Sequence, residues 1–309
     1  MEYQKPPLTF EEQAGQLLAR GLDADKEELI HRLAGVNYYR LSGYLFPFRQ
    51  NGSDDFVPGT SLQTVWRRYC FDRRLRVLTL DAIERIEVAV RTRLVYTFTH
   101  RHGPFGHLDD QNLPKLKIGD YLEWRLKLQE ETARSKETFR KAFFEKYGDH
   151  HKELPLWMLC ELMSMGSLLT FLKGVEPSIV SEVGKPWHLP DELLLSWLGC
   201  LYATRNICAH HARFWNRELG FQPKLPNRNK FPDWHGDAKP RTNRCGIILL
   251  ICRHWLGMIS PSSSWHRRVE DLFAEYPDVP LADMGMTDAW TQHPVWISAR
   301  PTYPSRPSP

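Results

Sequence analysis

Apolar residues recur at steps of three and four along most of this chain, which is the period of an amphipathic α-helix. The longest run covers residues 62–102 and stops at Gly103 and Pro104, which are typical residues after a helix end. The opposite side of this predicted helix is rich in arginine. Acidic residues on the same side can pair with these arginines. We therefore expect a solvated face there, with phosphate binding as the alternative.

Shorter runs with the same period predict further helices. Thr9 and Glu12 fit a capping box, in which the side chain of each residue accepts the backbone N–H of the other. Pro190 precedes a run whose period we follow as far as Arg217. The predicted helices cover residues 9–21, 25–33, 121–147 as two helices, 156–172, 191–217, 247–258 and 266–274.

No segment alternates apolar and polar residues as a half-buried strand does, and no internal repeat is present. The sequence therefore predicts an all-α fold. We expect an N-terminal helical and aromatic segment over residues 1–60, packed on a main helical domain over 61–275. The prolines beyond residue 294 predict that 276–309 is a largely irregular tail.

Composition narrows the class of protein. The chain has 309 residues, 42% hydrophobic and 25% charged, which is ordinary globular usage rather than that of a disordered chain. No apolar run approaches the roughly 20 residues of a membrane span. The N-terminus has no apolar signal-peptide core. The six cysteines form no CxxC pair. We expect a cytoplasmic protein with reduced thiols, no bound metal and no cofactor.

The net charge of +4 is mild, but its distribution is uneven. The loop over residues 222–245 is basic and rich in proline, and Lys224, Arg228 and Lys230 lie in its first half. Such a loop can follow a phosphate backbone. We consider RNA contact and simple solvation of this loop equally good interpretations, and Trp234 could add base stacking.

The segment 201–219, LYATRNICAHHARFWNREL, carries the densest group of reactive side chains. On one continuous helix, Asn206, His210, Arg213 and Arg217 would share a face. An imidazole can move protons near neutral pH. Guanidiniums bind phosphate in a fork. This combination suits phosphodiester chemistry without a metal, although a solvated helix face with capping histidines is the simpler alternative.

Arg205 does not fit that common face. It precedes His210 by five positions, which is about 140° around an ideal helix. Two facing copies of the chain could combine these groups into one site. The geometry is therefore a weak indication of a homodimer.

The hexad Arg205–His210 resembles the Arg-x4–6-His motif of HEPN ribonucleases, with a polar residue, Asn206, directly after the arginine. The wider chain, over about residues 1–275, resembles the AbiD/AbiF-like abortive-infection proteins of bacteria, the Abi family. The blocks that carry this resemblance are Lys5–Thr9, Asn37–Tyr44, Tyr69–Arg76, Glu84–Glu87, Leu154–Met158 and Arg205–Arg217.

The resemblance implies an all-α, HEPN-like helical bundle with additional N-terminal helices, acting in phage defence. It implies that Arg205 and His210 are catalytic, with Asn206 supporting, in metal-independent RNA cleavage. HEPN ribonucleases generally pair two motifs across a homodimer. Some members of the Abi family are restrained by a structured non-coding RNA, so RNA is expected as substrate and as a candidate regulator. His211 is the reserve candidate for the proton-moving group.

Several other features have a functional and a structural interpretation. Arg93 and His100 form a second, looser arginine–histidine pair, which we do not favour as a half-site. His100, His102 and His107 match no established zinc spacing, so metal binding is not expected.

The remaining predicted RNA contacts are side chains near the motif or exposed in the aromatic segment 37–44. Tyr39 and Arg40 are the candidates within that segment, although core packing is its simpler role. The full set is His211, Arg213, Arg217, Lys224, Arg228, Lys230, Tyr39 and Arg40.

Two functions of other classes compete with a ribonuclease. The chain could be a non-catalytic RNA-binding HEPN module, in which Arg205 and His210 hold phosphate without cleaving it. It could also be a protein-interaction component of a toxin–antitoxin pair, for which RNA is irrelevant. The sequence alone specifies neither the RNA target nor the trigger.

Overall fold

The fold is described from a computed structural model that covers residues 2, 4 and 6–298. Over these residues the chain forms thirteen α-helices joined by short 3-10 turns. The only β-type pairings in this part of the chain are two isolated bridges. The predicted all-α class is confirmed. The same residues contain no helix that combines the length and apolar character of a membrane span.

The N-terminal segment forms three short helices, α1 (Phe10–Ala19), α2 (Lys26–Val36) and α3 (Tyr38–Leu45). The capping box before α1 is confirmed: Glu12 N–H donates to Thr9 Oγ1 at 3.2 Å, and Thr9 N–H donates to Glu12 Oε2 at 2.7 Å. The aromatic segment 37–44, left unassigned in the sequence, is mostly helix α3. Asn37 starts α3 by accepting the Tyr39 N–H at 2.8 Å.

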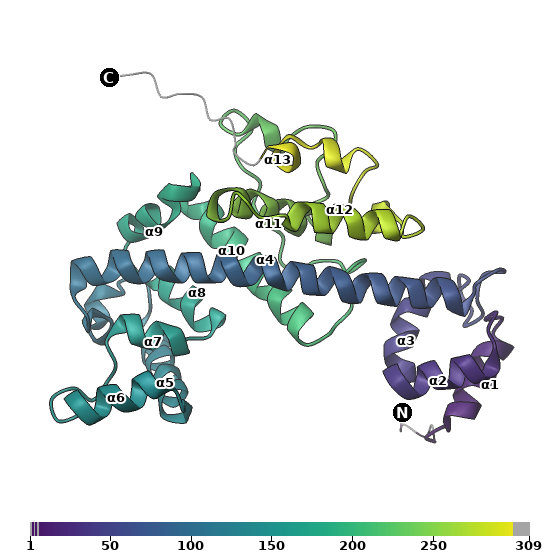
Figure 1. Cartoon of the computed structure of the whole chain (residues 1–309), viewed down its shortest axis with the longest axis horizontal. Helices are drawn as coiled ribbons and strands as arrows, with labels where there is room; N and C mark the ends of the chain where they lie inside the picture. Colours follow the sequence, from purple (N-terminus) through teal and green to yellow (C-terminus); the bar gives the residue numbers. More distant parts are fainter. Residues whose placement is uncertain (1, 3, 5, 299–309) are drawn as a thin grey trace.

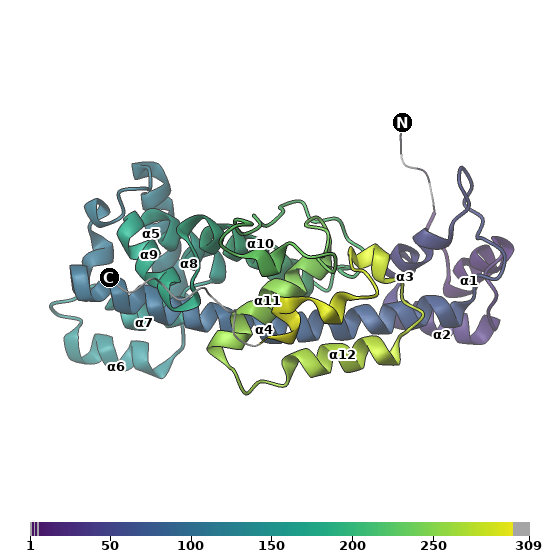
Figure 2. The ribbon, with the colours of Figure 1, turned by 90° about the horizontal axis from the view of Figure 1, so that it is seen from above.

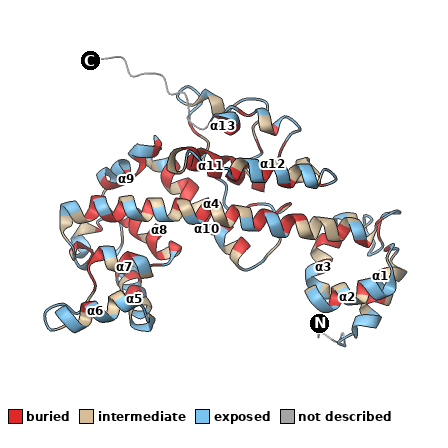
Figure 3. Cartoon of the chain, in the orientation of Figure 1, coloured by how far each residue is buried: buried red, intermediate tan, exposed pale blue. Residues whose placement is uncertain are grey.

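The predicted long helix is confirmed as α4 (Leu62–His102), whose 41 residues span about 60 Å. Figures 1 and 2 show that α4 runs along the molecule, with α3 beside its start and α7 (Leu156–Leu162) and α9 (Pro177–Gly184) near its end. Buried residues recur along its whole length (Figure 3). Most of the other helices pack against α4 as a common axis.

Most of the arginines on α4 are used as structural tethers. Arg67 binds Asp278, at 2.9 Å through Nη2, and Arg101 binds Glu182 at 3.2 Å. Intrahelical pairs such as Arg85–Asp81 are also present. The arginine-rich side is therefore less solvated than the sequence predicted, because helices and loops dock onto it.

Between α4 and residue 275 the chain contains eight further helices. Residues 121–147 form two helices, as predicted, while the helix predicted over 156–172 is broken in two. The bounds are α5 (Ile118–Arg134), α6 (Thr138–Tyr147), α7 (Leu156–Leu162), α8 (Met165–Gly174), α9 (Pro177–Gly184), α10 (Asp191–Ala209), α11 (Cys245–Ile259) and α12 (Trp265–Glu275).

Side-chain caps explain the break between α7 and α8. The Ser164 hydroxyl accepts the Ser167 N–H at 3.3 Å and so begins α8. Arg91 of α4 donates to the carbonyl oxygens of Cys160 and Met163, which end α7. These donors replace the hydrogen bonds that a continuous helix would have made.

Helix α10 ends at Ala209, eight residues before the predicted end at Arg217. The end is a Schellman motif: Ala212 N–H donates to Ile207 O at 2.9 Å, and His211 N–H donates to Cys208 O at 3.1 Å. His211 takes the left-handed position, with φ of 57°. Glycine usually occupies this position, so the sequence carried no strong stop signal.

Packed structure continues beyond residue 275, where the sequence predicted an irregular tail. The segment contains the short helix α13 (Pro294–Ile297), and Trp290 and Trp296 are buried. Arg253 Nε donates to Trp296 O at 2.9 Å, and Trp296 Nε1 donates to Glu270 at 2.6 Å. Residues 299–309 of the predicted tail lie outside the described residues.

Candidate functional site

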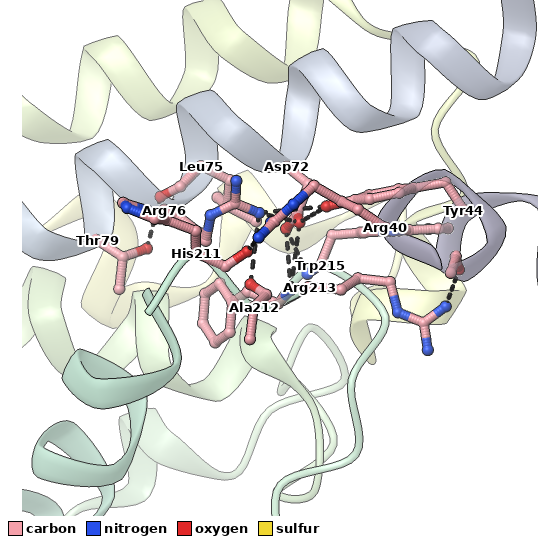
Figure 4. A network of polar contacts seen from close by, with 12 residues as sticks. Arg40, Tyr44, Asp72, Leu75, Arg76, Thr79, His211, Ala212, Arg213 and Trp215 are labelled. Atoms are coloured by element: carbon pink, nitrogen blue, oxygen red, sulfur yellow. Dashed lines mark hydrogen bonds and ion pairs between the residues drawn. The ribbon is translucent and has the colours of Figure 1, made fainter. Parts of the chain in front are cut away.

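Three segments that are far apart in the sequence meet at the buried carboxylate of Asp72 on α4 (Figure 4). Tyr44 of α3 donates its hydroxyl to Asp72 Oδ2 at 2.6 Å. The backbone N–H groups of Phe214 and Trp215 donate to Oδ1 at 3.1 and 2.8 Å. Arg76, one turn further along α4, forms an ion pair with Oδ2. Asp72 therefore joins α3, α4 and the loop after α10.

The polar partners of Asp72 favour its ionised form, and burial opposes them. Burial is the largest influence and raises the pKa of Asp72, while the charge of Arg76 and the hydrogen bonds from Tyr44, Trp215 and Phe214 act in the opposite direction. All of these partners are donors, so the ionised group can accept every bond. Burial next to Asp72 also raises the pKa of Tyr44, which keeps its hydroxyl protonated as a donor.

The turn after α10 is held by further side chains. Arg40 of α3 donates to the carbonyl oxygen of His211, and Arg76 Nη1 lies 3.4 Å from the carbonyl oxygen of Ala212. Arg213 reaches back and donates to the carbonyl oxygen of Gly43 in α3. The backbone of residues 211–215 is therefore tied to both α3 and α4.

Arg205, Asn206 and His210 lie at the fixed end of α10, and the side chains of Arg205 and His210 are exposed. His210 N–H still donates to Asn206 O, at 3.0 Å, so Asn206 and His210 lie one helical turn apart on the same side. Arg205 Nη1 lies 3.5 Å from Asn206 Oδ1. A single chain thus brings the guanidinium of Arg205 to the amide of Asn206, on the side of α10 where His210 follows one turn later.

This geometry changes two sequence interpretations. The predicted common face ends at His210, because the Schellman motif at His211 redirects the chain before Arg213 and Arg217. The angle of about 140° between Arg205 and His210 still describes the backbone. It does not by itself require a second copy, because the long Arg205 side chain bends toward Asn206.

The predicted RNA contacts near the motif fall into two groups. Arg40 and His211 border the end of α10, and Tyr39, next to Arg40 in the chain, is 87% exposed. Arg213 is half-buried and bonded to α3, so its position is structural. Arg217 is exposed and follows the loop that Asp72 holds.

The basic loop does not converge on the motif. After residue 217 the chain runs back along α10, and the Lys224 N–H donates to Ser196 Oγ at 2.8 Å. Lys224 Nζ pairs with Glu192 at 2.7 Å, in the first turn of α10 and about 25 Å along the helix from His210. Arg228 and Lys230 are exposed beyond it.

Trp234, which the sequence suggested as an RNA-stacking residue, is instead buried. Its ring centroid lies 4.8 Å from that of Trp197 and 5.5 Å from that of His254. His235 Nε2 lies 2.7 Å from Pro226 O, within the same loop. The loop therefore uses Trp234 to dock on α10 and α11, and the interpretation as a stacking surface was wrong.

The second arginine–histidine pair is remote from the first. Arg93 and His100 lie about 30–40 Å along α4 from Asp72, so one chain does not combine them with Arg205 and His210. His107 is buried, which lowers its pKa to about 3. Within residues 2, 4 and 6–298, no group of three or more His, Cys, Asp or Glu side chains is placed to hold a metal ion.

Sequence reasoning missed Asp72, Tyr44 and Arg76 as parts of the site. The available signal was that Asp72 falls on the apolar stripe of the long helix, in line with Leu75 and Thr79. A carboxylate on a buried stripe is informative because such a group is rarely buried without partners. It predicts donors from elsewhere in the fold.

Comparison with known proteins identifies a family for most of the chain. The family of Abi-like proteins matches residues 31–216, which is more than half of the sequence and includes α3, α4 and the Arg205–His210 end of α10. No curated protein and no solved structure matches the chain significantly. The match covers all three segments that meet at Asp72, and this chain belongs to the Abi-like protein family.

Proposed function

We propose that this chain is a metal-independent endoribonuclease of the HEPN type that acts in phage defence. One observation carries the proposal: Arg205 and His210 are exposed beside Asn206 on a helix end that the buried Asp72 network fixes. Catalytic groups must be held in a defined geometry while remaining accessible to substrate. The end of α10 meets both requirements.

The chemistry needs only groups that this helix end supplies. The ribose 2′-oxygen attacks the adjacent phosphorus, the bond from phosphorus to the 5′-oxygen breaks, and a 2′,3′-cyclic phosphate and a 5′-hydroxyl result. His210 moves the proton that the 2′-hydroxyl loses to the 5′-oxygen that departs, a role that contributes about 10²–10⁴ in rate. Arg205 stabilises the charge that develops on the phosphorane oxygens. Asn206 orients Arg205 through its amide oxygen.

Membership of the Abi-like family supports abortive infection as the biological setting. RNA is then the substrate, and a structured non-coding RNA is a candidate restraint. A homodimer would bring a second Arg205–His210 pair to the first. This arrangement belongs to the proposal because HEPN motifs generally act in pairs.

The test is cleavage of a labelled, unstructured RNA by the purified chain in EDTA, with and without extract of phage-infected cells. Wild type is compared with Arg205→Ala and His210→Ala. Arg267→Ala and His31→Ala are matched controls, because both residues are exposed and lie on α12 and α2, away from the end of α10. Product ends are identified by phosphatase resistance and by labelling with polynucleotide kinase.

We expect EDTA-resistant cleavage that leaves cyclic-phosphate ends, is lost in both motif variants and is retained in both controls. If wild type and motif variants bind RNA equally and none cleaves it under either condition, the catalytic proposal fails and the non-catalytic RNA-binding module replaces it. If no RNA binds or is cut, the protein-interaction alternative gains.

A further inference from the structure

A groove opens between α5, α8 and α10, on the molecule's surface and away from the Asp72 network. Figures 1 and 2 show α8 between the other two helices. The groove has two adjoining parts of about 350 and 310 Å³, which share Lys127, Thr170 and Lys173. The part beside α10 is also lined by Tyr202 and Phe221.

Two glycines inside helices form the floor of the α10 part. The ring of Phe221 lies over Gly199 of α10, where an added Cβ would be 3.2 Å from the ring. The ring of Tyr202 lies over Gly166 of α8, where an added Cβ would be 3.0 Å from the hydroxyl. Glycine within a helix costs about 1 kcal/mol relative to alanine. Both positions are used to seat an aromatic ring at the groove surface.

Phe221 is held in place and yet remains accessible. The chain after α10 runs back along the helix, and Cys200 Sγ donates to Phe221 O at 3.3 Å. The Phe221 side chain is 52% exposed. One face of its ring therefore packs on α10 while the rest is open to a ligand.

The groove is in line with the proposed catalytic groups. Asn206 and His210 follow Gly199 by seven and eleven positions, so all three lie within about 40° of arc on α10. The rise from Gly199 is about 10 Å to Asn206 and about 16 Å to His210. A chain that passes the Phe221 ring above Gly199 and extends along α10 therefore reaches His210.

The charge of the groove distinguishes its two parts. The residues that line the α10 part include Lys127 and Lys173 and no acidic residue. The part beside α5 adds Asp120 and Glu123. A polyanion is thus attracted more strongly to the α10 part than to the part along α5, where the two acidic residues balance the shared lysines.

We propose that the α10 part of the groove binds a single-stranded RNA segment and leads it to Asn206 and His210. Lys127 and Lys173 contact phosphates, and Phe221 and Tyr202 stack on unpaired bases. Aromatic stacking combined with a basic groove is the usual basis of single-strand binding. The bases of an RNA duplex are paired and cannot stack on these rings. This inference rests on the proposed ribonuclease function and adds the form of its substrate.

The experiment measures binding of a fluorescent 12-nucleotide oligouridylate to the full chain carrying His210→Ala, so that the probe stays intact. Lys127→Glu/Lys173→Glu is expected to weaken RNA binding at least tenfold. The salt dependence of binding should also fall, by an amount that corresponds to about two phosphate contacts. Phe221→Leu keeps apolar contact with Gly199 but cannot stack, and is expected to weaken binding roughly tenfold. Lys26→Glu/Lys136→Glu makes the same charge change at exposed sites away from the groove and should leave binding unchanged.

Each outcome separates the groove from the catalytic proposal. If the groove variants bind oligouridylate like the parent chain while Arg205→Ala still abolishes cleavage, the groove proposal is overturned and the ribonuclease remains. If binding falls in the groove variants but wild type never cleaves RNA, the groove stands and the catalytic proposal fails. Tighter binding of an RNA duplex than of oligouridylate, or binding of no RNA, also overturns the groove proposal.

Discussion

Replacing Asp72 with asparagine tests whether the buried network holds the end of α10. The substitution preserves shape but removes the charge opposite Arg76, whose side chain is 6% exposed. An asparagine amide cannot accept all the bonds that Tyr44, Phe214 and Trp215 donate to the carboxylate. Breaking a buried ion pair by removing one partner costs about 3–5 kcal/mol. We expect the free energy of unfolding, from urea denaturation, to fall by about 3 kcal/mol.

A second substitution identifies the source of that loss. In Asp72→Asn/Arg76→Met the unpaired charge is gone, so the double variant should be more stable than Asp72→Asn alone. The matched control is Asp54→Asn, a carboxylate paired with Arg20 and Arg49 at the surface. Exposed ion pairs contribute little to stability, so this change should be far smaller than that at Asp72.

The Asp72 variant should also lose RNA cleavage at temperatures where it remains folded, because the turn over residues 211–215 no longer fixes His210. Two results would refute the reasoning. One is a loss of less than about 1 kcal/mol in Asp72→Asn, which is below the range for a broken buried pair. The other is additive destabilisation by Asp72→Asn and Arg76→Met, which would mean that the two side chains are not energetically coupled.

Three further predictions concern stability and assembly. Burial lowers the pKa of His254 and His293 to about 4, so between pH 6.5 and pH 4 the unfolded chain binds more protons than the folded chain. The free energy of unfolding should therefore fall from pH 6.5 towards pH 4, by on the order of 3 kcal/mol for each residue. Urea titrations at a series of pH values should show a smaller fall for His293→Gln than for wild type. His211→Gly should raise the melting temperature of the chain, because His211 has a φ of 57°, a backbone conformation that glycine adopts without steric cost. A fall of about 1 kcal/mol in the free energy of unfolding, as for glycine in a helix interior, would contradict the Schellman motif. The homodimer can be tested with a heterodimer, purified through two tags, that carries Arg205→Ala in one copy and His210→Ala in the other. This heterodimer should recover about half of the wild-type cleavage if the site is shared between copies. No recovery would mean that each chain acts alone.

The period of apolar residues was sufficient to predict the elements that depend on burial. It gave α4 with both ends correct, because one unbroken apolar stripe begins at Leu62 and because Gly103 and Pro104 follow its end. The same reasoning predicted α11 and α12. An apolar stripe reports which residues face the core, and this requirement is the same whatever the partner helices are.

Helix ends were harder to predict when their stop signals came from other parts of the fold. Arg91 of α4 ends α7 by binding the carbonyl groups of Cys160 and of Met163, which directly follows the helix, although Arg91 is remote in sequence. His211 ends α10 in a conformation that usually calls for glycine. A left-handed histidine is retained here because the turn is fixed on both sides, by Arg40 at His211 O and by Asp72 at the following N–H groups. Neither tether has a local sequence signature.

Asp72 also explains why separate sequence blocks belong together. The blocks Asn37–Tyr44, Tyr69–Arg76 and Arg205–Arg217 each contribute a partner to one buried carboxylate. Such a network is costly when only partly satisfied, since each unpaired buried group loses its hydration without compensation. Removing a partner in one block therefore leaves buried polar groups of the other two blocks unpaired, so we expect the three blocks to change together. The exposed Arg205 and His210 make no such contribution, so stability alone does not require them, and the proposed ribonuclease activity is what gives these two side chains a role.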